Sequence, residues 1–249
     1  MIPYVELHSI QVGLIRIPVQ PLLAAVGIMT GHFLFIRRAR RQGLEPAEAA
    51  SMSFWMVAAG LAGAHLFRFL YLPDLLSNDP WIWAKTTAGL SSFGGLSGGL
   101  IGAGAYARIR GMPQARLYGY LDSLAYVFPS AWIFGRLGCS LVHDHPGLRS
   151  TSVLAVNFPR FPRFDLGVIE LLFLAVVIVP LFLILDRRPR PAVFYLPLLL
   201  CTYGLFRILL DRLHVDPPRY FGLSVDTVAY GLLVALGFYQ RRHGRLWAT

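Results

Sequence analysis

Charged residues are scarce in this chain, and lysine is almost missing. Of 249 residues, 14% are charged; 13 are acidic, 23 are basic, and Lys85 is the only lysine among the basic ones. The chain is 55% hydrophobic and has a mean hydropathy of +0.55. This composition excludes an ordinary soluble domain of this size and indicates an integral membrane protein.

Several common signals are also missing. No basic residue precedes Arg16, so we expect no cleavable signal peptide. The two cysteines, Cys139 and Cys201, lie at a helix end and in the middle of an apolar segment, and we expect no disulfide between them. The sequence has no glycine-rich NTPase loop, no internal repeat and no soluble second domain. We therefore expect no nucleotide and one membrane domain over residues 1–249.

Seven apolar segments are long enough to cross a bilayer, which takes roughly 20 residues as a helix. They are Val19–Ile36, Ala49–Leu72, Trp81–Ala107, Leu117–Phe134, Leu166–Leu185, Ala192–Leu210 and Phe221–Phe238. They are too long and too continuous for barrel strands. Because a backbone in lipid must satisfy its own hydrogen bonds, the sequence predicts an all-α protein with seven transmembrane helices.

Arginines gather in every second connection between these segments, and they predict the orientation. The clusters are Arg37, Arg38, Arg40 and Arg41; Arg108, Arg110 and Arg116; Arg187, Arg188 and Arg190; and Arg241, Arg242 and Arg245. The positive-inside rule makes these connections cytoplasmic. The N-terminus is then outside and the C-terminus inside. The division of charge among loops disfavours a nucleic-acid surface, despite a net charge of +10.

Ionisable residues within or beside the apolar segments fall mostly near the outer end. They are Arg68, Arg136, Asp144, Glu170, Arg207, Asp211 and Asp226. An ionisable group in lipid is costly and usually functional. This placement predicts a polar reaction chamber that opens to the outer side.

The outer connection over residues 135–165 holds the first candidate constellation. Arg136 ends the fourth segment, and a guanidinium binds phosphate through two parallel hydrogen bonds. In His143-Asp144-His145 a carboxylate can orient an imidazole as a general base. The His-x-His spacing also suits a metal, although a tetrahedral zinc site needs further ligands. Acid–base chemistry, lipid contact, metal binding and a structural loop all remain open.

The second constellation is Tyr203, Arg207 and Asp211, whose spacing puts all three on one helical face. Asp211 can pair with Arg207, either as a buried ion pair joining helices or as support for an anion clamp. Glu170 opens the fifth segment and can pair with Arg136 or Arg207, or hold a proton. Asp122 lies toward the cytoplasmic side and is expected to bond to a neighbouring helix.

The third segment is rich in glycine between Gly89 and Gly104. Small residues let membrane helices approach closely. Paired glycines such as Gly94 and Gly95 can also break a helix and expose N–H groups to an anion or a lipid. Both interpretations remain open.

At these residues the chain resembles the prolipoprotein diacylglyceryl transferase family of bacterial inner membranes. The resemblance lies in Gly135-Arg136-Leu137-Gly138 with an acid at Asp144, and in Tyr203-Gly-x-x-Arg207 with Asp211. Glu170, Asp122, Gly222-Leu-Ser and the Gly94–Leu96 run also have counterparts, and order and spacing agree over nearly the whole chain.

The chain departs from the family pattern at several positions. Cys139 replaces an asparagine, and Asp144 and Asp211 each replace a glutamate. Phe93 stands where the family has a histidine, and Gln20 or Pro21 where it has a tyrosine. His143 or His145 could replace the missing histidine.

The resemblance implies a transferase that moves a diacylglyceryl group from phosphatidylglycerol to the lipobox cysteine of a preprolipoprotein, with an active site facing the periplasm. His143, Asp144, His145, Arg136 and Arg207 would be catalytic. Arg136 and Arg207 would also bind substrate, together with Cys139, Glu170, Tyr203, Asp211, Gly94 and Gly95. No metal and no other cofactor is expected.

Three alternatives remain. A divergent paralogue could move a different lipid group or use another acceptor, as the changes at Phe93 and Cys139 suggest. A lipid-binding or transport protein could keep the arginine clamp without chemistry. A metal-dependent membrane hydrolase could use His143 and His145.

Overall fold

The computed structural model describes residues 1–71, 91–215, 219–220 and 223–243. Part of the predicted segment Trp81–Ala107 and residues 221–222 lie outside this range, and the side chains of Arg68, Phe93 and Asp226 are also not described. Two compact units are present: Met1–Leu34 with Leu121–Thr249, and Phe35–Tyr120.

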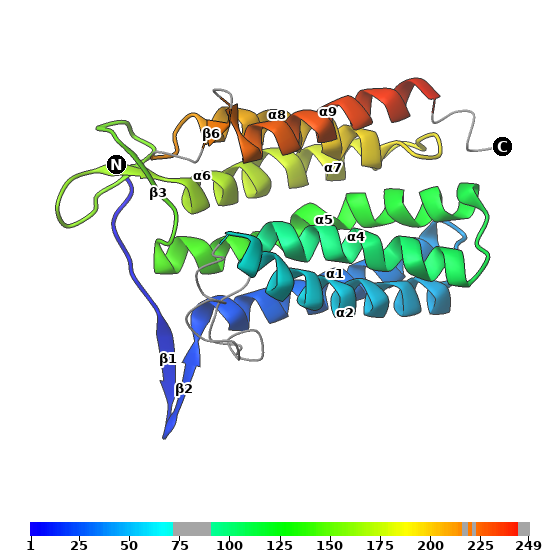
Figure 1. The fold of residues 1–249 in the computed structure, drawn as a ribbon, viewed down its shortest axis with the longest axis horizontal. Helices are drawn as coiled ribbons and strands as arrows, with labels where there is room; N and C mark the ends of the chain where they lie inside the picture. Colours follow the sequence, from blue (N-terminus) through cyan, green and yellow to red (C-terminus); the bar gives the residue numbers. More distant parts are fainter. Residues whose placement is uncertain (72–90, 216–218, 221–222, 244–249) are drawn as a thin grey trace. The chain divides into compact units, whose positions relative to one another are not determined.

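Long helices dominate the described chain, as the sequence predicts. They are α1 (Val19–Arg41), α2 (Pro46–Tyr71), α4 (Ser92–Ile109), α5 (Gln114–Val142), α6 (Leu166–Leu172), α7 (Val179–Leu185), α8 (Tyr195–Asp211) and α9 (Val225–His243), with the π-helical segment η3 (Phe173–Ile178) joining α6 to α7 (Figure 1). Three of the described helices are long and apolar enough to cross a membrane: Val19–Arg41, Pro46–Phe67 and the continuous run Leu166–Leu185. The count of seven spans and the orientation of the termini stay predictions.

Short antiparallel strands, which the sequence analysis did not predict, accompany the helices. They are β1 (Ser9–Val12) with β2 (Ile15–Pro18); β3 (Pro146–Arg149), β5 (Arg163–Asp165) and β4 (Ala155–Val156), in that spatial order; and β6 (Arg219–Tyr220) with β7 (Leu223–Ser224). Ile2 forms an isolated bridge with Val156. The three-stranded sheet leads directly into α6 and so fixes where that helix begins.

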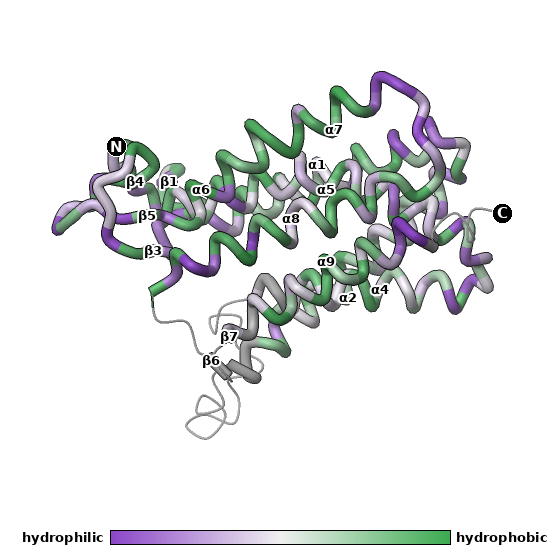
Figure 2. Tube along the Cα trace, turned by 90° about the horizontal axis from the view of Figure 1, so that it is seen from above, coloured by the Kyte–Doolittle hydropathy of each residue, from purple (hydrophilic) through white to green (hydrophobic). Residues whose placement is uncertain are grey.

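The core of the larger unit lies between α5, the α6–α7 run and α8. Its buried members are Ala125, Leu174, Ile178, Phe182, Tyr195, Leu199 and Tyr203. Figure 2 shows the α6–α7 run as largely hydrophobic, followed by a hydrophilic connection to α8. Asp122 of α5 accepts a 2.7 Å hydrogen bond from the Leu196 N–H at the start of α8. The expectation that Asp122 bonds to a neighbouring helix is therefore confirmed.

The smaller unit is built on close contact between α2 and α4. A β-carbon added at Gly98 would collide with the Ala59 carbonyl, and one added at Gly102 would lie 2.5 Å from the Trp55 carbonyl oxygen. Helix α4 runs unbroken from Ser92 to Ile109. The structure therefore supports close packing for the glycine-rich stretch and shows no helix break within α4.

Candidate active site

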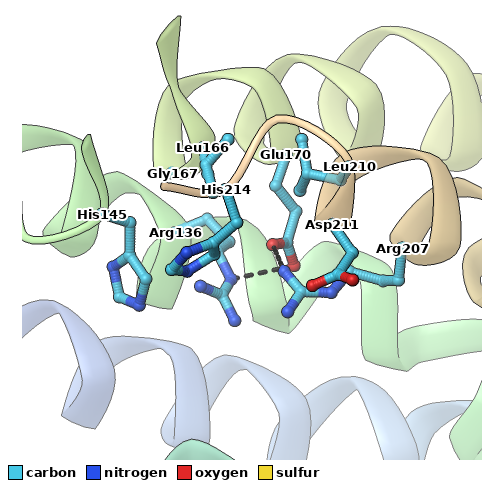
Figure 3. A pocket seen from close by; sticks show the side chains of 9 residues that line it. All are labelled: Arg136, His145, Leu166, Gly167, Glu170, Arg207, Leu210, Asp211 and His214. Carbon is cyan, nitrogen blue, oxygen red and sulfur yellow. Dashed lines mark hydrogen bonds and ion pairs between the residues drawn. The ribbon is translucent and has the colours of Figure 1, made fainter. Parts of the chain in front are cut away.

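One buried carboxylate joins two arginines in the larger unit. Glu170 of α6 is fully buried, and its Oε1 lies 2.9 Å from Nε of Arg136 on α5. Its Oε2 accepts a 2.5 Å hydrogen bond from Nη1 of Arg207 on α8. Figure 3 shows both guanidinium groups beside this carboxylate. The two arginines, far apart in the sequence, therefore meet on the partner that the sequence analysis offered for either one.

Aromatic side chains complete this centre. Trp132 donates its indole N–H to Oε1 of Glu170 at 3.1 Å, and the Tyr203 hydroxyl donates to the same oxygen. The Arg136 guanidinium carbon lies 4.9 Å from the Trp132 ring centroid, and that of Arg207 lies 4.8 Å from the Tyr230 ring centroid. Burial behind aromatic rings strengthens charge–charge attraction, because water is excluded.

Trp132 and Tyr230 were not predicted from the sequence as site residues. Trp132 lies four residues before Arg136, and therefore on the same face of α5. That spacing was a usable signal. Tyr230 carried no such signal, because the approach of α9 to α8 could not be derived from the sequence.

Arg136 is the guanidinium best placed to take a ligand. Within the described part of the chain its contacts are the ion pair through Nε and the stacking on Trp132. In Figure 3 its terminal nitrogens point away from Glu170. A planar guanidinium with two terminal nitrogens available can bind a phosphate or carboxylate through two hydrogen bonds.

A cavity of about 110 Å³ adjoins the two arginines. Its walls are formed by Arg136, His145, Leu166, Gly167, Glu170, Arg207, Leu210, Asp211 and His214 (Figure 3). This volume is several times the roughly 30 Å³ that one water molecule occupies in the liquid. A small anionic group fits such a space.

Asp211 lines the cavity, and its Oδ2 is hydrogen-bonded to β7 and to α9. That oxygen accepts hydrogen bonds from the Ser224 hydroxyl at 2.5 Å and the Thr227 hydroxyl at 2.7 Å. Asp211 therefore ties the end of α8 to the start of α9, whereas Glu170 holds Arg207. The sequence had left Asp211 and Glu170 open as partners of Arg207.

The two histidines of the outer connection have separate partners. His145 lines the cavity, and its Nδ1 lies 2.5 Å from Oδ1 of Asp144. The Nδ1 of His143 lies 2.7 Å from Oδ2 of Asp165, and its Nε2 lies 3.1 Å from the Val5 carbonyl oxygen. Both ring nitrogens of His143 are therefore engaged outside the cavity, and His143 holds the N-terminal segment in place. Of these two histidines, His145 is the one that lines the cavity beside the arginines.

The hydrogen bonds to Asp144 and to Cys139 raise the pKa of His145 to about 9. Burial acts to raise the pKa of Asp144, but the hydrogen bonds from His145 and Gln20 and the positive charges of His145 and Arg136 together lower this pKa. Near neutral pH the two groups therefore form an ion pair. Gln20 supports the pair by donating to Oδ2 of Asp144 at 2.8 Å and to the Cys139 sulfur at 3.6 Å.

Helix α6 sets the position of Glu170. Asp165 caps this helix, because its Oδ1 accepts the Val168 N–H at 3.0 Å. Gly167 lets α6 approach α5, since a β-carbon there would lie 3.3 Å from the Cys139 β-carbon. The missing side chain thus allows the first turn of α6 to lie against the helix that carries Arg136.

Comparisons with known proteins identify a family for this chain. A family model described as prolipoprotein diacylglyceryl transferase matches residues 8–240. A relative from Frankia alni, named as a phosphatidylglycerol–prolipoprotein diacylglyceryl transferase, is 28% identical over 94% of this chain and 66% of its own length. Relatives with the same name from Pseudomonas fluorescens and Chromohalobacter salexigens are 24% and 26% identical, over 99% and 94% of this chain and 95% and 88% of their own lengths. The chain thus spans just under two thirds of the Frankia protein and nearly all of the Pseudomonas protein.

Proposed function

This chain belongs to the prolipoprotein diacylglyceryl transferase family, and on that premise we propose that it moves a diacylglyceryl group from phosphatidylglycerol to the lipobox cysteine of a prolipoprotein. The relatives carry this donor and acceptor in their names. The observation that carries the proposal is the meeting of Arg136 and Arg207 on Glu170 beside a small cavity.

The reaction breaks the bond between the glyceryl carbon and the phosphate oxygen of the lipid. A substrate thiolate attacks that carbon, a thioether forms, and glycerol phosphate leaves with the bonding electron pair. Negative charge grows on the departing phosphate, and preorganised cations in a water-poor site stabilise such charge best. Arg136 supplies terminal N–H groups to this phosphate, and Arg207 adds a second positive charge.

Glu170 has the task of holding the clamp in place. Two guanidinium groups without a carboxylate would repel each other, and each would bear a large cost of burial. Trp132 and Tyr203 also hold the carboxylate through hydrogen bonds to Oε1, the oxygen that contacts Arg136. The clamp is therefore rigid before the lipid arrives, which lowers the cost of organising charge during the reaction.

The acceptor thiol must lose its proton to attack. His145 is the candidate base, because it lines the cavity and is oriented by Asp144. Only the neutral imidazole can accept the proton. The neutral fraction of His145 increases as the pH rises toward its pKa of about 9. We assign no reacting role to His143.

The decisive experiment uses purified protein, phosphatidylglycerol and a synthetic lipobox peptide. The peptide is expected to gain the mass of one diacylglyceryl unit, also when a chelator is present. A peptide with serine in place of the cysteine should gain nothing. An active relative, assayed in parallel, serves as the positive control. If this protein does not modify the cysteine peptide but still binds phosphatidylglycerol vesicles, the chain is a lipid-binding protein without this chemistry.

Matched arginine variants test the clamp. Arg136→Ala and Arg207→Ala are each expected to lower turnover at least about 100-fold, the usual scale for loss of one stabilising donor. Arg188→Ala removes the same charge at an exposed position of the connection between α7 and α8 and should keep full turnover. Full turnover in either clamp variant would contradict the proposed role of that arginine.

A further inference from the structure

Three side chains of different chemistry converge at the edge of the cavity. The candidate ligand atoms of Cys139, Asp144 and His145 all lie within 4.8 Å of one another. Cys139 comes from the end of α5, whereas the other two come from the connection that follows it. The sequence alone allowed a metal on His143 and His145. The structure separates those two residues and puts a thiol in the place of the second imidazole.

We propose that Cys139, Asp144 and His145 form a binding site for a divalent cation of the zinc class. Zinc takes sulfur, nitrogen and carboxylate oxygen at about 2.0–2.3 Å in tetrahedral sites, which separates its ligand atoms by roughly 3.3–3.8 Å. The ligand atoms of the three residues lie within 4.8 Å of one another, so small side-chain rotations would bring them to the tetrahedral separation. Three protein ligands leave a fourth position for water or another small ligand.

Charge and access both favour such an ion. A thiolate and a carboxylate together neutralise a divalent cation, which offsets its repulsion by the nearby Arg136. The side chains of His145 and Asp144 are 40% and 33% exposed, so an ion can reach the cluster, while Cys139 is 9% exposed and fixes the inner ligand. Gln20 bonds to both Asp144 and Cys139 and would orient them as an outer partner.

Metal binding would also affect the proposed transfer reaction. His145 cannot ligate an ion and accept a proton from the substrate thiol at the same time. A bound ion is therefore expected to stop transfer. This consequence alone rests on the proposed function, and the binding site itself does not.

Cobalt(II) is a suitable probe, because thiolate ligation gives it a near-ultraviolet charge-transfer band. The wild-type protein, purified without a histidine tag, is expected to bind one equivalent of cobalt(II) with this band, and zinc should displace it. Cys139→Ser should abolish the band, and Cys201→Ser, which removes the other cysteine, should leave it intact. His143→Gln should also leave it intact. Gln20→Ala should weaken affinity about tenfold.

A second measurement needs no variant. Zinc is expected to protect Cys139 of the wild-type protein from alkylation, as read by mass spectrometry of its peptides, with Cys201 as the internal reference. A wild-type protein without the thiolate band, or a band that survives in a folded Cys139→Ser variant, would overturn the proposal. Equal alkylation of Cys139 with and without zinc would overturn it as well.

Discussion

Individual side chains decide how charge is held in this protein. The sequence already indicated that Arg136 and Arg207 needed a partner, because unpaired charges are rare in apolar segments. It could not choose between Glu170 and Asp211, since that choice depends on how each helix is rotated. Glu170 contacts both arginines, and Asp211 accepts hydrogen bonds from one hydroxyl on β7 and one on α9. His143 and His145 were equivalent candidates in the sequence for the same reason.

Glu170→Gln is expected to destabilise the protein by about 3 kcal/mol, because removing one member of a buried ion pair leaves the other charge uncompensated. The loss should appear as a lower unfolding midpoint in detergent, together with loss of transfer. Glu6→Gln makes the same change at a residue with an exposed side chain and serves as the control. Unchanged unfolding of Glu170→Gln would show that the arginines do not depend on this carboxylate.

The rate of transfer should rise with pH up to about 9 when a chelator is present. The direction follows from the raised pKa of His145, since the imidazole is protonated below about pH 9 and only its neutral form can act as a base. His145→Gln should remove this dependence along with most of the rate. A wild-type rate that falls between pH 7 and 9 would instead assign His145 a role in its protonated form.

At the scale of the helices, the long elements could be predicted from the sequence and the irregular ones could not. The apolar pattern predicted the long helices, because a long apolar segment in lipid must satisfy its backbone hydrogen bonds within itself, as a helix does. It did not predict η3, which begins three residues after Glu170 and is followed by Pro180 at the start of α7. A π-helical turn depends on tertiary packing, and such turns often lie beside functional sites. The small sheets were missed because their strands are only two to four residues long.

The contact between α2 and α4 can be tested with two matched glycine substitutions. Gly98→Ala is expected to destabilise the protein by about 1–3 kcal/mol, because the new methyl group would collide with the Ala59 backbone. Gly104→Ala lies on the same helix, with no atom within 4 Å of the added carbon. It should be neutral or slightly stabilising, since alanine favours a helix by about 0.5–1 kcal/mol. Equal unfolding midpoints for the two variants would contradict the close-packing interpretation.

At the scale of the whole molecule, the alternation of arginine clusters is the main guide to orientation. The family assignment supports a membrane enzyme, and the apolar helices agree with it. The periplasmic position of the site in the bacterial inner membrane is our proposal. It follows from the basic connections, because the residues at the cavity lie at the opposite helix ends.

Reporter fusions test this orientation. A phosphatase that is active only in the periplasm should work when fused within residues 150–162, and it should stay silent when fused after Arg188 or after Arg242. A fluorescent protein that matures only in the cytoplasm should show the opposite pattern. Phosphatase activity after Arg188 would reverse the assigned topology.

The cap of α6 has a consequence for the far N-terminal stretch. Asp165 uses one oxygen to begin the helix that carries Glu170 and the other to bind His143, which in turn holds the carbonyl of Val5. Proteolytic trimming of the first eight residues would leave the His143 ring without its outer tether. Because Asp165 is shared, the first turn of α6 would then be held less firmly, and with it the position of Glu170 between the two arginines.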